Sequence, residues 1–283
     1  MGRGIVDGMT FRNLTQRIVN RLAGATVEHH FTDRILNMPN PLYRAVLPDD
    51  GLCRDGVTVY RRFVTPMETA AIRRSIPDEE LTYQASGHFH YSLQPLSLHP
   101  LVPDLALSAS RYASAYFQRD AFLSESDYRK VLPLNLAQHE RDDPKFAKGY
   151  SPSHWHYDIR GRQIKAMLYL TDVGPGDQNF ACLPGSHKGW KSADYAASRY
   201  TDGQVAAMLA MGRPVREVYG RAGDIVIFDT NIIHRLRRTE SRERESITFN
   251  FHPGRMLRVV PQVLHPDTED HTRKALARMA VVK

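Results

Sequence analysis

Two segments far apart in the chain carry residue types that can bind one metal ion together. The first is His156-Tyr157-Asp158, and the second is the run from Phe228 to His234, FDTNIIH. Two histidines and one carboxylate form the facial triad of non-haem Fe(II) oxygenases, which binds one face of an octahedral ion and leaves three positions open. We therefore predict that His156, Asp158 and His234 are the metal ligands and the catalytic residues, with Fe(II) as the metal.

The elements that carry these residues are expected to be strands from different parts of a sheet. Side chains at positions i and i+2 of a strand share a face, so His156 and Asp158 should project together and Tyr157 should point away. One short segment cannot cover a whole octahedral face, so the third ligand must come from another strand. His234 follows His156 by 78 residues, which is long enough to cross a jelly roll and return. A His-x-Asp pair alone is weak evidence in a chain with 13 histidines.

Short apolar segments separated by glycine and proline turns fill the chain from about residue 131. Many short strands with such turns are typical of a β-sandwich or barrel. The alternation of apolar and polar residues within 55–63 predicts one more strand upstream. The other predicted strands are 132–138, 164–171, 179–183, 215–218, 224–228 and 246–252.

Helices are expected to flank these strands. The sequence Thr65-Pro66-Met67-Glu68 is a capping box with proline at the first helical position, and it predicts a helix to about Arg74. A second helix is predicted over 103–121, and a helical segment over 204–211 lies inside an insert, 188–213. Amphipathic spacing predicts a helix over 9–24 near the N-terminus, and 266–279 predicts a final helix.

Three further stretches surround the metal-binding segments in a fixed order. They are LYLTDV at Leu168–Val173, LPGSHKG at Leu183–Gly189, and a run ending in AGDIVIFD at Asp229; DGVTVYRRFVTP precedes them. Over residues 50–253 the sequence resembles the phytanoyl-CoA dioxygenase (PhyH-like) family. The resemblance implies a double-stranded β-helix (a cupin-like jelly roll), Fe(II), dioxygen, and 2-oxoglutarate as co-substrate. It does not imply phytanoyl-CoA as substrate, because the family oxidises many small molecules.

The resemblance also points to co-substrate residues. Members of the family place an arginine about ten residues after the distal histidine, where it binds the far carboxylate of 2-oxoglutarate. Arg244 follows His234 by ten residues, and a planar bidentate donor suits a carboxylate. Arg242, on the same predicted strand face, is the competitor for this role. Asp158 stands where halogenating relatives carry Gly or Ala, so hydroxylation or another oxidation is favoured over halogenation.

Three more residues are candidates for contact with 2-oxoglutarate. Asn135 and Gln138 lie on a predicted strand where relatives contact the co-substrate, although solvent-facing or ladder roles stay open. Tyr169 shares a strand face with Lys165 and could reach the co-substrate, although a place in the core stays open. His187, in the Pro-Gly-Ser-His turn, is interpreted as a turn histidine satisfied by backbone groups.

The substrate-binding candidates are His154, Arg160 and Arg235. His154 lies two residues before His156 and on the same predicted face, with a strand-edge position as the alternative. Arginines near the triad suggest an anionic substrate that carries a carboxylate or phosphate. The alternative for the arginines of 235–244 is a solvated loop, with Glu240, Glu243 and Glu245 as partners.

The composition is that of an ordinary globular protein. Of 283 residues, 42% are hydrophobic and 24% charged. We expect no signal peptide and no membrane span, because no apolar run reaches about 18 residues. The two cysteines, Cys53 and Cys182, favour a reducing, cytoplasmic location. The net charge of +7 is partly local, and Arg235 to Arg244 lacks the interleaved aromatic residues of a nucleic-acid surface.

The prediction is a mostly β protein with flanking helices and three parts. Residues 1–50 form a helical or irregular extension, 51–260 form the double-stranded β-helix domain with 188–213 as a candidate lid, and 261–283 form a C-terminal helix. The predicted function is an Fe(II)- and 2-oxoglutarate-dependent dioxygenase that oxidises an unactivated C–H bond of a small, anionic metabolite or biosynthetic intermediate. Hydroxylation is the default outcome, and desaturation, epoxidation and ring formation stay open because they use the same site. The alternative is a jelly-roll metal protein without 2-oxoglutarate, such as a cupin-type isomerase or binding module. Arg244 discriminates between them.

Overall fold

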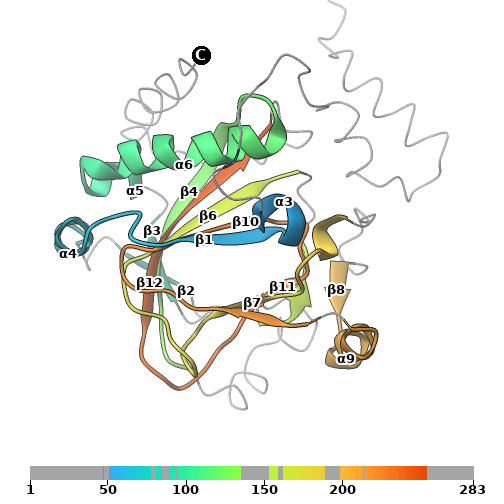
Figure 1. The fold of residues 1–283 in the computed structure, drawn as a ribbon. Helices are drawn as coiled ribbons and strands as arrows, with labels where there is room; N and C mark the ends of the chain where they lie inside the picture. Colours follow the sequence, from blue (N-terminus) through green and yellow to red (C-terminus); the bar gives the residue numbers. More distant parts are fainter. Residues whose placement is uncertain are drawn as a thin grey trace, which may run out of the picture.

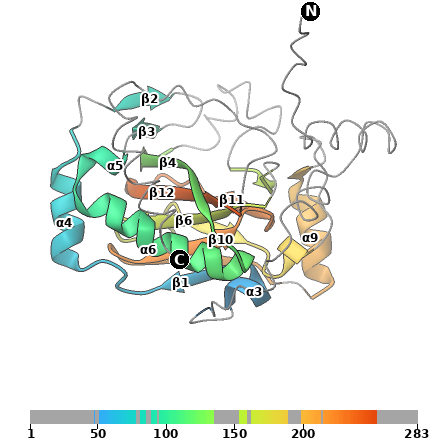
Figure 2. The ribbon, with the colours of Figure 1, turned by 90° about the horizontal axis from the view of Figure 1, so that it is seen from above.

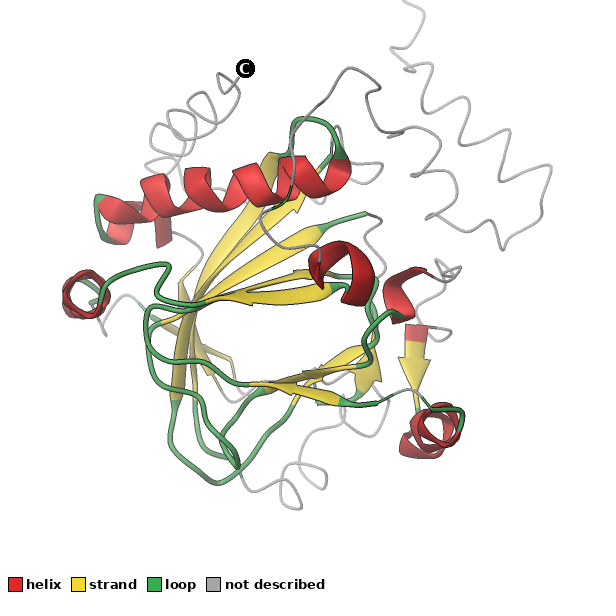
Figure 3. Cartoon of the chain, viewed as in Figure 1, coloured by secondary structure: helices red, strands yellow, loops and turns green. Residues whose placement is uncertain are grey.

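Two antiparallel sheets face each other in the computed structural model, which describes residues 47, 51–77, 81–84, 89–92, 95–134, 153–158, 162–188, 198–212 and 214–253 (Figures 1 and 3). The larger sheet has seven strands in the order β1-β10-β6-β12-β4-β3-β2, and the smaller has five in the order β8-β5-β11-β7-β9. This arrangement confirms the predicted jelly-roll class.

The strands are short in the smaller sheet and longer in the larger one. The larger sheet contains β1 (Val57–Tyr60), β2 (Thr82–Gln84), β3 (Phe89–Ser92), β4 (Phe122–Val131), β6 (Ile164–Tyr169), β10 (Ile225–Asp229) and β12 (Arg244–His252). The smaller sheet contains β5 (Trp155–His156), β7 (Phe180–Cys182), β8 (Arg199–Tyr200), β9 (Arg216–Val218) and β11 (His234–Leu236).

Helices cover the outer face of the larger sheet. The longest helix, α6 (Leu101–Phe117), lies across β4, β12, β6 and β10, with α5 (Pro95–Leu98) beside it (Figure 2). The predicted capping box begins α4 (Pro66–Arg74), because the Thr65 hydroxyl accepts a hydrogen bond from the Glu68 amide at 3.2 Å. The remaining helices are α3 (Gly51–Asp55), the short 3-10 helix η3 (Ser186–Lys188) and α9 (Asp202–Ala210).

The two faces of β12 show how the fold separates its core from its cavity. Every second residue, namely Ile247, Phe249 and Phe251, packs in one apolar cluster with Ala109, Ala113 and Phe117 of α6. Alanines on the helix allow it to approach the sheet closely. The intervening residues point between the two sheets and are polar; they are Arg244, Ser246, Thr248 and Asn250. Because side chains alternate along a strand, β12 presents its apolar residues to the helix and its polar residues to the cavity.

Most predicted elements are confirmed, but one boundary was wrong. The predicted helix 103–121 begins at Leu101 and ends at Phe117, because Gln118 adopts a left-handed conformation with φ 53°. Residues 122–131 then form β4, which was not predicted, and 132–134 of the predicted strand 132–138 are not a strand. Glu125 and Arg129 of β4 line the cavity, and Ser124, Ser126 and Lys130 alternate with them, so the strand shows no regular apolar pattern. The strands β2, β3 and β8 were also missed.

Several predictions lie outside the described residues. These are the extension 1–50 apart from residue 47 and its helix 9–24, the C-terminal part 254–283 with its helix 266–279, and the middle of the insert, 189–197. The described end of the insert contains α9, which matches the predicted helical segment 204–211. Within the described part of the chain, no helix is long and apolar enough to cross a membrane.

Candidate metal centre

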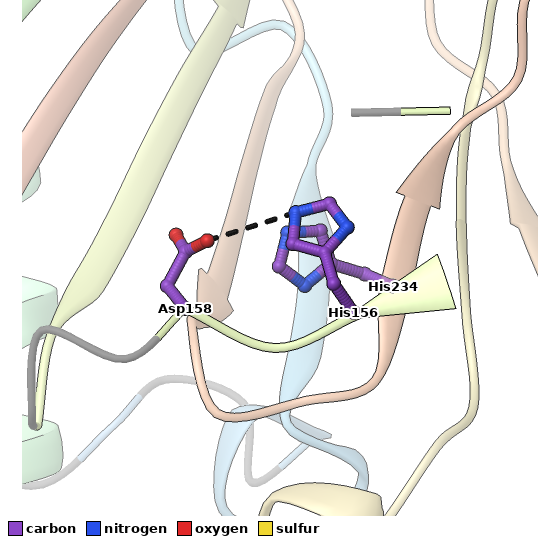
Figure 4. A group of neighbouring side chains, drawn as sticks. All are labelled: His156, Asp158 and His234. Carbon is purple, nitrogen blue, oxygen red and sulfur yellow. Dashed lines mark ion pairs between the residues drawn. The ribbon is translucent and has the colours of Figure 1, made fainter. Parts of the chain in front are cut away.

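The two histidines of the predicted triad lie side by side on paired strands. β5 and β11 run antiparallel, and their register places His234 directly opposite His156. The centroids of the two imidazole rings are 4.3 Å apart, and Figure 4 shows both rings turned toward the same space. Sheet pairing thus brings together two residues that are 78 positions apart in the sequence.

Asp158 completes the cluster from just beyond the end of β5. Its Oδ1 lies 3.7 Å from Nε2 of His156 (Figure 4), and one ligand atom from each of the three residues lies within 4.8 Å of the others. β5 ends at His156, so strand alternation does not place Asp158 as the sequence argument assumed. Its backbone N–H instead donates to the Thr230 carbonyl at 2.9 Å. Tyr157 is among the residues that line the cavity, and its ring centroid lies 6.2 Å from that of Tyr200.

Both histidines are oriented by their own backbone. Nδ1 of His156 lies 2.7 Å from the His154 carbonyl, and Nδ1 of His234 lies 2.8 Å from the Ile232 carbonyl. A carbonyl only accepts, so each Nδ1 carries the proton and each Nε2 keeps its lone pair. Such a hydrogen bond sets the tautomer of a metal-ligating histidine. Burial lowers the pKa of both imidazoles, which also favours the neutral form.

Asp158 is ionised despite its surroundings. Burial alone would raise its pKa, but the Lys165 ammonium, followed by the two histidines, outweighs burial and holds the pKa well below its usual range. Nζ of Lys165 lies 3.0 Å from Oδ2 of Asp158. Two neutral imidazole nitrogens and one carboxylate oxygen are the donor set of the facial triad, so these residues fit Fe(II).

The triad opens into a cavity of about 340 Å³ between the two sheets. This volume is in the range of small-molecule sites. Apolar side chains come from both sheets and include Met167, Phe180, Phe228 and Leu236. The polar side chains come mostly from the larger sheet and its borders; they are Glu125, Arg129, Gln163, Lys165, Arg244, Ser246, Thr248 and Asn250.

Arg244 is a buried cation in this cavity. Arg244 is 5% exposed. Its Nη1 donates a hydrogen bond to the Gln178 carbonyl at 2.8 Å, and its Nε has no partner among the described residues. Burial lowers the pKa of Arg244 to about 10, so the guanidinium is still charged at neutral pH. Within the described residues it makes no salt bridge to a carboxylate. A buried charge is normally paired, so the cavity is built to receive an anion at this end.

Ser246 extends this anion-binding end and was missed by the sequence analysis. It lies two residues along the same face of β12, lines the cavity and is 1% exposed. Its Oγ has no protein partner in the described structure. The spacing of Arg244 and Ser246 could have indicated this position, because residues i and i+2 of a strand share a face.

The structure separates Arg244 from its competitor, Arg242. Arg242 is exposed at the surface and forms a forked ion pair with Asp177, with Nη2 at 2.7 Å from Oδ2. Its guanidinium therefore has a carboxylate partner already, whereas that of Arg244 lies in the cavity. Arg242 is not among the residues that line the cavity.

The other arginines after His234 do not face the metal-binding residues. Arg235 lies on the opposite side of β11, 4.5 Å from the Trp155 ring centroid and 3.4 Å from Asp202. Arg237 pairs with Glu217 at 2.6 Å. Two of the three acidic residues expected as partners pair elsewhere: Glu243 pairs with Lys130 and Glu245 with Arg73.

The remaining predicted residues have varied positions. Tyr169 lies in the apolar cluster beneath the cavity. Its hydroxyl donates to the Val218 carbonyl at 3.5 Å, and burial raises its pKa to about 12.

His154 accepts a hydrogen bond from His156 through its backbone carbonyl and does not line the cavity. His187 is a buried turn residue with Nε2 3.3 Å from the Cys53 carbonyl, as expected. Asn135, Gln138 and Arg160 lie outside the described residues.

Two cavity residues have positions that the sequence did not predict. Arg199, on the unpredicted strand β8, pairs in register with His156 and lines the cavity. No sequence pattern marked it, because a two-residue strand has no periodicity. Lys165 contacts Asp158, although the sequence analysis placed it only near the co-substrate. A lysine within an otherwise apolar predicted strand could have indicated a residue that faces a polar cavity.

Comparisons with known proteins agree with this geometry. The sequence model of the phytanoyl-CoA dioxygenase (PhyH) family matches residues 135–244, a segment that contains the triad and Arg244. No curated protein sequence gives a significant match.

Solved structures share the fold at low identity. The chain is similar to the non-haem alpha-ketoglutarate-dependent carbocyclase SnoK from nogalamycin biosynthesis, with 19% identity, 71% of this chain and 81% of that chain covered, and a TM-score of 0.53. HygX from Streptomyces hygroscopicus, with nickel and 2-oxoglutarate bound, has 15% identity, coverage of 74% and 88%, and a TM-score of 0.52. EctD from S. alaskensis with bound Fe has 14% identity, coverage of 75% and 81%, and a TM-score of 0.52.

At these identities the solved structures show the fold, and the family match adds the chemistry. The match spans the region that the sequence motifs marked, and the predicted triad is assembled within it. Residues 135–244 thus match the phytanoyl-CoA dioxygenase family, and the predicted class of non-haem Fe(II)- and 2-oxoglutarate-dependent dioxygenase agrees with that match.

Proposed function

We propose that His156, Asp158 and His234 hold the Fe(II) ion, and that Arg244 and Ser246 hold the distal carboxylate of 2-oxoglutarate. The observation that carries this assignment is the buried Arg244 guanidinium, which has no carboxylate partner in the described part of the chain and lies in the same cavity as the triad. When bound, iron would activate dioxygen, the oxidant, with two electrons from 2-oxoglutarate, which would leave as succinate and carbon dioxide, and the other two electrons would come from the C–H bond.

The protein itself contributes ligand geometry and a controlled environment. The two Nε2 atoms and the Asp158 carboxylate are oriented before any metal arrives, because each has its own hydrogen bond. Phe180 and Phe228 pack within 5.4 Å of the His234 ring, measured between centroids. These rings exclude water from one side of the metal-binding residues, which protects a reactive centre from side reactions.

The proposed reaction is hydroxylation of an unactivated C–H bond in a small molecule. Asp158 occupies the third ligand position, so no position is vacated for a halide. SnoK is described as a carbocyclase and SnoN as an epimerase, which shows that this fold serves other outcomes too. The test is mass spectrometry of the product formed under isotopically labelled dioxygen. One labelled oxygen atom in the product supports hydroxylation, and a product without added oxygen contradicts it.

The proposed substrate carries an anionic group. Two arginines close to the triad in sequence do not support this proposal, because Arg162 lies over the Phe117 ring at 5.2 Å and Arg235 lies on the far side of β11. Arg199 now carries the proposal, because it lines the cavity directly across from His156. We expect R199A to raise the KM for an anionic substrate at least tenfold and to leave 2-oxoglutarate affinity unchanged. An unchanged KM would contradict the anionic assignment.

A further inference from the structure

Lys165 occupies an unusual place for a lysine. On β6 its neighbours Ile164, Ala166 and Leu168 pack in the core beneath α6, whereas Lys165 points into the cavity. Its Nζ lies 3.0 Å from Oδ2 of Asp158 and 5.9 Å from the centroid of the Phe228 ring. A charge in such a wall is costly unless it is paired, so the pair with Asp158 accounts for the lysine.

The two oxygens of Asp158 have different neighbours. Oδ1 lies 3.7 Å from Nε2 of His156, toward the other metal-binding residues. Oδ2 accepts the hydrogen bond from Lys165. The backbone N–H of Asp158 donates to the Thr230 carbonyl at 2.9 Å, so the residue cannot easily rotate as a whole. The carboxylate is thereby divided into one oxygen for a metal and one oxygen for a lysine.

This division matters for the number of open positions at the metal. A carboxylate can bind a cation through one oxygen or through both. The facial triad is useful because it uses three positions and leaves three open. If Asp158 bound through both oxygens, it would take a fourth position, and 2-oxoglutarate, which needs two, would fill the rest.

We propose that Lys165 is a positioning residue that restricts Asp158 to one metal-binding oxygen and so preserves the position for dioxygen. This inference rests on the proposed function, since it assumes that the triad holds Fe(II). It assigns Lys165 no contact with the reacting atoms. The lysine acts through the carboxylate that it holds.

The experiment compares wild type with K165M and K165R as full-length protein under anaerobic conditions. Methionine keeps the unbranched shape and removes the ammonium, whereas arginine keeps a cationic donor. Fe(II) affinity is measured first, and then the affinity of the Fe(II)- and 2-oxoglutarate-loaded protein for nitric oxide, a dioxygen analogue, by electron paramagnetic resonance. We expect K165M to bind Fe(II) within threefold of wild type or more tightly, and nitric oxide at least tenfold more weakly. K165R should remain within threefold of wild type for both.

The outcomes separate positioning from a merely structural role. Loss of Fe(II) affinity in K165M together with a lower unfolding temperature would mean that Lys165 only supports the fold, and would overturn the inference. Nitric oxide affinity equal to that of wild type would overturn it too, whatever the Fe(II) affinity. Failure of the proposed function is visible separately, because wild type itself would then show no 2-oxoglutarate complex with its iron.

Discussion

The two faces of the seven-stranded sheet differ in chemistry although they are built from the same strands. On the helix side, Ile247, Phe249 and Phe251 are fully buried against α6. On the cavity side, Arg244, Ser246 and Asn250 each keep a buried polar atom without a partner among the described residues. An unsatisfied buried polar group costs about 1–3 kcal/mol. The comparison indicates that packing on the helix side stabilises the folded state, whereas the polar residues on the cavity side lower the stability of the folded state and are available to bind ligands.

The largest expected effect comes from removing a metal-binding histidine. In H234A, turnover should fall more than about ten-thousandfold, which is over 5 kcal/mol in the activation barrier, because two ligands cannot define one face of the ion. The unfolding temperature of the apo protein should change little. H187Q is the control, since His187 is also buried but is held by the Cys53 carbonyl away from the triad. Equal Fe(II) binding by H234A and wild type would refute the ligand assignment.

The second effect tests the helix side. F249A should lower the free energy of unfolding by about 3–5 kcal/mol, the usual cost of truncating a buried phenylalanine. The adjacent T248A faces the cavity and should cost less than about 1 kcal/mol. Urea unfolding of both variants measures the difference. Similar losses in the two would mean that the faces do not divide stability and binding as described.

The third effect tests the anion-binding end of the cavity. R244M should weaken 2-oxoglutarate binding roughly a hundredfold, about 2.7 kcal/mol, while Fe(II) affinity stays unchanged. R242M is the matched control, because Arg242 is two residues away but exposed and paired with Asp177. Anaerobic titration of 2-oxoglutarate into the Fe(II) protein gives both affinities. A larger effect in R242M than in R244M would reverse the assignment.

The fourth effect concerns a polar link between the two faces. The Tyr116 hydroxyl, from α6, donates to Asp229 Oδ2 at 2.6 Å, and Asp229 Oδ1 accepts from the Asn231 N–H at 2.8 Å. This connects the helix to the loop before His234. Y116F should cost about 1–2 kcal/mol of stability, whereas Y112F should cost less. Equal melting temperatures for the two variants would show that the link contributes nothing.

The smallest effect is a dependence of stability on pH. Burial opposes ionisation of Asp224, but the N–H groups of Arg221 and Arg62 and the Arg61 guanidinium outweigh it and lower its pKa. A lowered folded-state pKa adds stability above the unfolded value of about 3.9, and this stability is lost as pH falls through the folded pKa. Wild type should therefore exceed D224N in stability at neutral pH, and the difference should shrink below about pH 4. A difference that is constant with pH would contradict this.

The residues of the proposed metal centre could be selected from the sequence because their chemistry is specific. His156, Asp158 and His234 were selected by residue type, and Arg244 by the resemblance to a family whose members place an arginine about ten residues after the distal histidine. Periodicity located β6, β10 and β12, because each has one mostly apolar face.

What escaped prediction was polar or very short. β4 was missed because polar residues occur on both of its faces: Glu125 and Arg129 line the cavity, and Ser126 and Lys130 alternate with them. Arg199 was missed because a two-residue strand has no pattern. The position of Asp158 depends on a backbone hydrogen bond to Thr230, and such long-range pairing is not readable from residue types.

The most direct test of the account is an anaerobic titration of the wild-type Fe(II) protein with 2-oxoglutarate, followed by visible absorption. A keto acid that binds iron through two atoms at such a centre gives a weak charge-transfer band near about 500 nm. We predict that the band appears and saturates at one 2-oxoglutarate per iron. Iron bound at full occupancy with no band at any 2-oxoglutarate concentration would contradict the account.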